Sequence, residues 1–132
     1  MTTRPPRLYR VIIPVSDIER AQKFYTALLG VEGERVSPGR HYFNCGGTIA
    51  ALFDPRADHD KFDARHNPDH VYFAVDDLDA VFARAKTLGC RRLEDAIKTR
   101  PWGERSFYAH DPFDNPICFV DSATLFTGSA KI

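Results

Sequence analysis

The sequence lacks the features that mark several large classes of protein. Its 132 residues contain only three cysteines, Cys45, Cys90 and Cys118, and no CxxC pair. An odd number of widely spaced cysteines argues against a disulfide scaffold and against a zinc knuckle. No apolar run is long enough to span a membrane, and the first residues lack the apolar segment of a secretory signal. We therefore expect a cytoplasmic protein with no membrane partner.

Net charge and the common nucleotide and nucleophile motifs are also missing. The 18 basic and 18 acidic residues give a formal net charge of zero, so no general attraction to nucleic acid or to an anionic membrane is expected. No GxGxxG, P-loop or GxSxG sequence occurs. The remaining composition is 43% hydrophobic and 27% charged, which is typical of one globular domain of this length.

The chain repeats one order of elements. LYRVIIPV (8–15) has the β-branched residues of a strand, and SDIERAQKFYTALLG (16–30) has a capped start, helical apolar spacing and a terminal glycine. HVYFAVDDLDAVFARAKTLGC (70–90) repeats this order, with His70 in the place of Arg10. Strand-like segments with turn residues follow each helix. The sequence therefore predicts two copies of strand–helix–strand–strand–strand.

The copies predict one domain over residues 1–132, made of modules at 7–54 and 69–121, a polar linker at 55–68 and a tail at 122–132. In the tail we expect a short helix at Ser122–Phe126. Side chains alternate along a strand, so Val11 and Ile13 are predicted to face the helix, while Arg10 lies on the opposite face. Two curved sheets related by a pseudo-twofold axis can turn these opposite faces toward a shared hollow.

Three segments resemble a known family. VSDIERAQKFYTALLG (15–30), DHVYFAVDDLDAVFARAKTLG (69–89) and WGERSFYAHDPFDNPICFVD (102–121) are similar in order and spacing to the vicinal oxygen chelate superfamily. That superfamily includes glyoxalase I, extradiol dioxygenases, fosfomycin resistance enzymes and bleomycin resistance proteins. The resemblance implies an α+β fold of two βαβββ modules, which form a cup-shaped, eight-stranded mixed sheet with one helix per module on the outer face. It also implies a homodimer, in which modules are sometimes exchanged between chains.

Enzymes of the superfamily usually hold one divalent metal ion in the cup, on the first and last strands of each module. Carried over by the resemblance, the four positions here are Arg10, Ala51, His70 and Cys118. Only His70 is a usual ligand, because arginine stays protonated and alanine has no donor atom. One histidine and one cysteine fall short of the three protein ligands of a catalytic zinc site. We therefore predict no metal cofactor; a single divalent ion held by atypical ligands is the alternative.

The same positions suggest other chemistry. Arg10 can bind a carboxylate or phosphate through two hydrogen bonds, or can pair with an acidic side chain of the protein. His70 is a candidate ligand contact and a candidate general base, or a histidine bonded to a neighbouring strand. Cys118 is a reactive thiol if a nearby cation lowers its pKa, and otherwise a small wall residue.

Aromatic side chains complete the predicted pocket. Tyr72 shares a strand face with His70, Trp102 lies on a loop or strand edge, and Tyr42 and Phe107 are predicted to face the cup. For each of these rings, the alternative to lining the pocket is packing in the hydrophobic core. His41 and His110 lie near turns and are expected to be surface or turn residues. DHDKFDARH (58–66) is expected to be a solvated loop, with metal binding as its alternative.

Two functions are consistent with these residues. The first is a binding protein that holds a small organic molecule, anionic or aromatic, in the cup without a metal ion. The second is a lyase, isomerase or dioxygenase-like enzyme that uses an atypical metal site or His70 as base. The sequence does not decide whether the protein is an enzyme.

Overall fold

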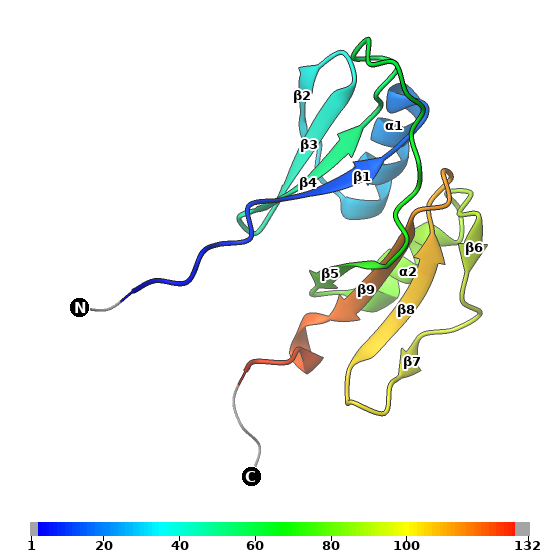
Figure 1. The fold of residues 1–132 in the computed structure, drawn as a ribbon. Helices are drawn as coiled ribbons and strands as arrows, with labels where there is room; N and C mark the ends of the chain where they lie inside the picture. The colour runs from blue at the N-terminus through cyan, green and yellow to red at the C-terminus, as the bar shows by residue number, and fades with distance from the viewer. Residues whose placement is uncertain (1–2, 129–132) are drawn as a thin grey trace.

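The computed structural model describes residues 3–128 and shows two modules, each a sheet with one helix (Figure 1). The first module contains β1 (Arg10–Pro14), α1 (Ile18–Leu29), β2 (Glu34–Ser37), β3 (Arg40–Cys45) and β4 (Thr48–Phe53). The second contains β5 (Val71–Val75), α2 (Leu78–Ala85), β6 (Arg92–Leu93), β7 (Lys98–Thr99), β8 (Arg105–His110) and β9 (Pro116–Asp121), followed by a 3-10 helix at Ser122–Thr124. The predicted α+β class and the duplicated order of elements are confirmed.

The two sheets have the same topology. Sheet A has the order β1-β4-β3-β2, and sheet B has the order β5-β9-β8-β6, with β7 also paired to β8. In each sheet the first strand runs parallel to the last, and the other pairings are antiparallel. Among the described residues no ladder joins β1 to β5, so the expected single eight-stranded sheet is instead two sheets with nine strands.

The extra strand arises at Glu94. Its backbone N–H donates to the Tyr108 carbonyl over 3.0 Å, but its side chain also accepts the Tyr108 N–H over 2.8 Å. A carboxylate thus takes the place of a backbone carbonyl, and the edge strand is divided into β6 and β7 on the same partner, β8. The alternation of residues predicts one strand here. It cannot show that the Glu94 side chain takes the place of a backbone carbonyl in the hydrogen bonding with β8.

Both helices start and pack as their sequences predict. Asp17 accepts a hydrogen bond from the Arg20 N–H over 3.1 Å, and Asp77 accepts one from the Ala80 N–H over 3.1 Å. Gly30 ends α1 in a left-handed conformation, with φ of 74°. The buried face of each helix follows the helical period: Ile18, Ala21, Phe24, Tyr25 and Leu28 in α1; Leu78, Val81, Phe82 and Ala85 in α2.

The helix-covered sides of both sheets share one hydrophobic core. The two helices contact each other, and Phe119 stacks between Phe73 and Phe107 with ring centroids 5.1 and 5.4 Å away. The opposite side of each sheet faces away from this core. We call these sides face A and face B. Face A carries Arg10, Ile12, Tyr42, Ala51 and Phe53; face B carries His70, Tyr72, Tyr108, His110 and Cys118.

A buried polar cluster at the β8–β9 turn joins the modules. The Asn115 side-chain amide donates to the Pro14 carbonyl over 2.6 Å and to Asp111 over 2.9 Å. The Tyr25 hydroxyl donates to Asp111 over 2.6 Å, and the Asn67 N–H of the linker donates to the Asn115 side chain over 2.8 Å. Burial raises the pKa of Tyr25 well above its usual value, so its hydroxyl stays a donor. This cluster holds β1, α1, the linker and the second module together.

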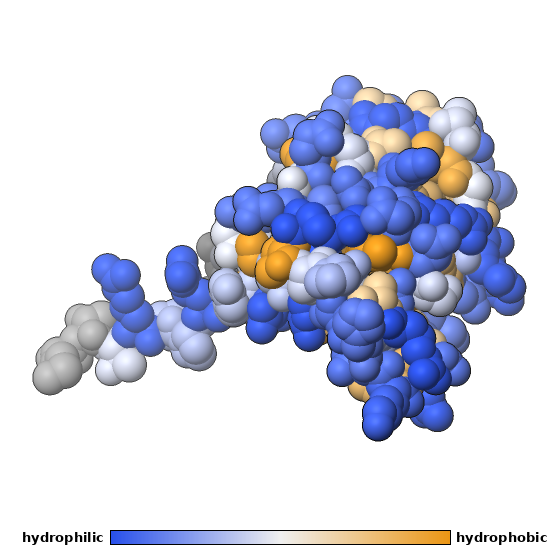
Figure 2. Space-filling model, turned by 90° about the horizontal axis from the view of Figure 1, so that it is seen from above, coloured by the Kyte–Doolittle hydropathy of each residue, from blue (hydrophilic) through white to orange (hydrophobic). Residues whose placement is uncertain are grey.

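The two ends of the described chain lie at the surface. Residues 3–7 are extended and leave the body of the molecule, whereas the Leu8 and Tyr9 carbonyls accept hydrogen bonds from Thr48 and Ile49 of β4 (Figures 1 and 2). On the face in Figure 2, hydrophilic residues predominate and hydrophobic ones form small patches. The expected helix at Ser122–Phe126 is a 3-10 helix at Ser122–Thr124, and Phe126 is exposed; residues 129–132 of the tail lie outside the described part.

Within residues 3–128, no helix is both long and apolar enough to cross a bilayer.

Candidate ligand-binding site

Face A presents a cation without a carboxylate partner. Arg10 donates to the Tyr42 hydroxyl over 3.0 Å, and its guanidinium lies 5.2 Å from the centre of the Tyr9 ring. Among the described residues, no acidic side chain forms an ion pair with Arg10. Ala51 lies beside Ile12 and Tyr42 in the ladder and adds no polar atom. The structure therefore shows Arg10 held by aromatic neighbours, with its charge unpaired.

Face A continues from Tyr42 to a cleft at the other end of β1. The Tyr42 hydroxyl also accepts a hydrogen bond from Arg40 over 3.3 Å, and the Arg40 guanidinium lies 4.3 Å from the centre of the Phe53 ring. Phe53 in turn meets Phe62 of the linker, with ring centroids 6.4 Å apart. The cleft has a volume of about 500 Å³ and is lined by Pro14, Phe53, Pro55, Phe62, Asp63, Ala64 and Arg65. The linker thus forms a wall on face A, which its polar sequence did not indicate.

Face B is an aromatic and imidazole surface. The His70 ring lies 4.6 Å from the Tyr108 ring and 6.3 Å from the His110 ring. Cys118 pairs with Tyr72 on one side and with Tyr108 on the other, and it is fully buried. Tyr72 is 58% exposed, so this surface is open to a flat ligand.

The protonation states on face B follow from burial and neighbouring charge. Burial raises the pKa of Cys118 to about 11, so the group is a thiol at neutral pH rather than a thiolate. Burial and the nearby His110 lower the pKa of His70, which keeps its imidazole neutral near pH 7. His70 therefore offers a lone pair, whereas Cys118 is a small neutral wall residue.

Arg100 lies on face B, beside Tyr108 and Ser106. Its guanidinium lies 4.3 Å from the centre of the Tyr108 ring, and it donates to Glu94 and, over 2.9 Å, to the Ser106 hydroxyl. Burial alone would raise the pKa of Glu94, but the hydrogen bonds from Arg100 and from the Tyr108 N–H outweigh burial and lower it. Arg100 is therefore neutralised by Glu94. No sequence pattern predicted this pair, because Glu94 and Arg100 lie on separate short segments.

The four family positions do not fit a divalent metal ion. Arg10 is a cation and Ala51 has no donor, so face A supplies no ligand from them. His70 is a suitable ligand on face B, but the Cys118 thiol is covered and protonated. Residues 3–128 include no group of three or more His, Cys, Asp and Glu side chains placed to hold a metal ion. These four side chains therefore offer too few donor atoms for the three protein ligands of a catalytic zinc site.

The structure places the predicted site residues on two surfaces. Arg10, Ala51 and Tyr42 share face A, while His70, Cys118 and Tyr72 share face B. No hydrogen bond, ion pair or ring contact joins Arg10 to His70 or Cys118 within the described residues.

Two assignments from the sequence need correction. Phe107 does not face a cup: it is fully buried in the core, and its strand neighbour Tyr108 takes the position on face B. His41 is not a turn residue but is buried in β3, with its ring bonded to the Glu32 carbonyl over 2.9 Å. His110, as predicted, lies near a turn: it ends β8 beside the β8–β9 turn, partly exposed on face B. Trp102 lies on the β7–β8 loop, 62% exposed, where its indole donates to Glu104 over 2.8 Å.

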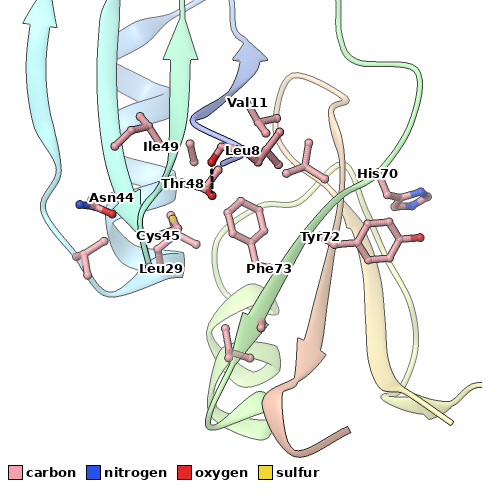
Figure 3. Close-up of a pocket in the computed structure, with 16 residues that line it drawn as sticks. Leu8, Val11, Leu29, Asn44, Cys45, Thr48, Ile49, His70, Tyr72 and Phe73 are labelled. Atoms are coloured by element: carbon pink, nitrogen blue, oxygen red, sulfur yellow. Dashed lines mark hydrogen bonds between the residues drawn. The ribbon is translucent and has the colours of Figure 1, made fainter. Parts of the chain in front are cut away.

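A second hollow lies between the modules, on the other side of β5 from face B. It has a volume of about 720 Å³ and separates sheet A from β5 (Figure 3). Phe73 points into it, whereas the His70 and Tyr72 rings point away from it (Figure 3). Its apolar lining includes Leu8, Val11, Leu29, Ile49, Val71 and Phe73. His70 and Tyr72, two of the predicted site residues, also line this hollow, although their rings project to the other side of β5 from Phe73.

Comparisons with known proteins agree with this architecture. The family model described as the Glyoxalase/Bleomycin resistance protein/Dioxygenase superfamily matches residues 7–119. A glyoxalase/bleomycin resistance protein from Albidiferax ferrireducens T118 is 25% identical, with a TM-score of 0.72 over 86% of this chain and 96% of that one. Lactoylglutathione lyase from Agrobacterium tumefaciens is 22% identical, with a TM-score of 0.70 over 90% of this chain and 96% of that one. No curated protein matches the chain.

Proposed function

The chain belongs to the glyoxalase/bleomycin resistance protein/dioxygenase superfamily, and from this membership we propose that it binds a small organic anion with an aromatic part, without a metal ion. The unpaired charge of Arg10 on face A is the observation that carries the proposal. A guanidinium presents a planar set of donors that matches a carboxylate or phosphate. Tyr42 orients this guanidinium, so less side-chain freedom is lost when an anion binds.

Face B supports the aromatic part of the ligand. His70, Tyr72 and Tyr108 present rings at their exposed side, and Cys118 between them is small and neutral. Ring contacts of this kind contribute about 0.5–1.5 kcal/mol beyond the area they bury. The neutral state of His70 leaves a nitrogen that can accept a hydrogen bond from the ligand.

We further propose that the protein acts as a homodimer. Arg10 and His70 lie on different faces of one chain, and the buried Asn115 cluster fixes the two modules in that arrangement. A second copy, related by a twofold axis, would set face A of one chain against face B of the other. Each of the two resulting sites would then contain both the cation and the aromatic surface.

Titration calorimetry on chelator-treated protein, purified without an affinity tag, tests the proposal against a panel of aromatic carboxylates and antibiotics. Arg10→Met should weaken the best ligand by about 10- to 150-fold, because a hydrogen bond to a charged group contributes roughly 1.5–3 kcal/mol. The matched control is Arg7→Met in the exposed N-terminal segment, which should leave the affinity unchanged. Binding that occurs only after a divalent ion is added would contradict the proposal.

Catalysis by His70 is the second candidate function. The observation that favours it is the lowered pKa, which keeps a general base ready at neutral pH. Metal-free protein that turns over a substrate, and loses turnover in His70→Ala, would support catalysis over binding alone. A stoichiometric divalent ion found by elemental analysis, and lost in His70→Ala, would instead support an atypical metal site.

A further inference from the structure

Resting on the proposed function, we propose that face A holds its ligand at two points. The acid group binds Arg10 and Tyr42 at one end of β1, and the aromatic ring of the ligand enters the cleft lined by Phe53 and Phe62 at the other end, so that within one chain the ring lies in this cleft and not on face B. The linker, which joins the two modules, is then part of the binding site. The ligand class is an elongated organic monoanion with a terminal ring.

The cleft has the size and lining for a ring. Pro14 and Phe53 are paired in the ladder and form its floor, and Phe62 rises from the linker as a wall. The Phe53 and Phe62 rings meet at an interplanar angle of 63°, which is an edge-on contact. Its volume of about 500 Å³ lies in the usual range for small-molecule pockets. Phe62 is still 54% exposed, so a ligand ring would cover apolar surface that the protein leaves open.

Arg10 and the cleft lie on one continuous surface. Arg10, Ile12 and Pro14 are alternate residues of one strand, so their side chains share face A. Four residues of strand place the ends of this row about 13 Å apart at 3.3 Å per residue. The ladder positions between them are Ile12 and Ala51, which are uncharged, and the Arg40 guanidinium beside them lies between Tyr42 and Phe53. A chain of methylene groups is therefore the connection that this part of the face accommodates.

The charges along the face favour this orientation. Arg40 above Phe53 is paired with Asp58 at 3.4 Å, and Asp63 at the cleft is paired with Arg56 at 2.8 Å. Neither group is therefore free to attract or repel a ligand strongly. Arg65 is an exposed cation at the cleft rim, whereas Arg10 is already oriented by Tyr42. Loss of rotamer freedom on binding is smaller for the oriented side chain, so the acid group binds at Arg10.

Two fluorescent probes with the same ring and acid but different spacing test the inference. Dansylglycine is the short probe and 6-(dansylamino)hexanoic acid is the long one, each titrated into chelator-treated protein. We expect the long probe to bind about tenfold more tightly, with a blue-shifted emission, because only its ring reaches the cleft. Phe62→Ala should remove this difference and leave the affinity for dansylglycine unchanged.

Three variants separate the possible outcomes. Phe126→Ala removes another exposed phenylalanine, 83% exposed in the tail, and should change neither probe. Arg10→Met should weaken both probes, and a larger loss in Arg65→Met would overturn the orientation. Equal affinity for the two probes, with both lost in Arg10→Met, would overturn the two-point site and leave the proposed function standing. If neither probe binds wild-type protein, both proposals fail. Thermal melts monitored by circular dichroism confirm that each variant is folded.

Discussion

The buried cluster at Asn115 should contribute strongly to stability, and Asn115→Ala tests its role. The side chain makes three hydrogen bonds: to the Pro14 carbonyl, to Asp111 and from the Asn67 N–H, at 2.6, 2.9 and 2.8 Å. At about 0.5–1.5 kcal/mol each, their loss costs roughly 3 kcal/mol of unfolding free energy. The groups that lose their hydrogen-bond partner are buried and cannot bond to water instead. The loss of unfolding free energy should therefore be at or above this value.

Urea unfolding followed by far-ultraviolet circular dichroism measures the effect. With a denaturant slope of about 2 kcal/mol per molar, the midpoint should fall by roughly 1.5 M. Asn44→Ala is the matched control, because Asn44 is exposed and its side chain accepts one hydrogen bond, from Gly47 at 2.8 Å. The control should lose less than about 1 kcal/mol. An equal, small loss in both variants would show that the cluster does not hold the modules together.

Three further outcomes follow from the structure. Cys118, with a pKa of about 11, should react with iodoacetamide far more slowly at pH 8 than the half-buried Cys45, and mass spectrometry of the labelled peptides would refute this if the order reversed. The folded state lowers the His70 pKa, so the unfolded chain takes up more protons below about pH 6.5, and stability should fall as the pH drops through that value. NMR titration should place the His70 pKa below 6.5 and show it rising in His110→Ala; an unshifted value would contradict the cause assigned. Gly33→Ala should destabilise more than Gly46→Ala in thermal melts, because both have positive φ but only at Gly33 would a Cβ lie 2.7 Å from the Tyr42 carbonyl oxygen; equal losses would rule out the steric reason.

Local sequence signals predicted most of the fold. Capping residues and helical spacing predicted the two helices, and the alternation along β1 and β5 assigned the two faces of each strand. These signals depend on residues that are close together in the chain, so they can be recognised in a single sequence. The division of an edge strand at Glu94 depends on a side chain that bonds to another strand, which periodicity does not record.

The candidate site was only partly predictable. Side-chain alternation correctly placed Arg10 and Tyr72 away from the core. For β8 the alternation left open which set of alternate residues faces the core, and the choice that put Phe107 on the site face was wrong. The register against Cys118 depends on the compact turn at Asp111–Asn115, whose hydrogen bonds involve the other module. Phe62 was missed because it joins face A through a contact between the linker and β4.

The edge of β1 is closed to strand addition. Its Ile12 and Pro14 carbonyls already accept hydrogen bonds from the Asn67 and Asn115 side chains, and proline has no N–H to offer a neighbour. An uncovered strand edge is a template for fibril growth, and occupied carbonyls together with a proline remove that template. The amides that link the two halves of the molecule thereby also protect an exposed sheet margin from aggregation.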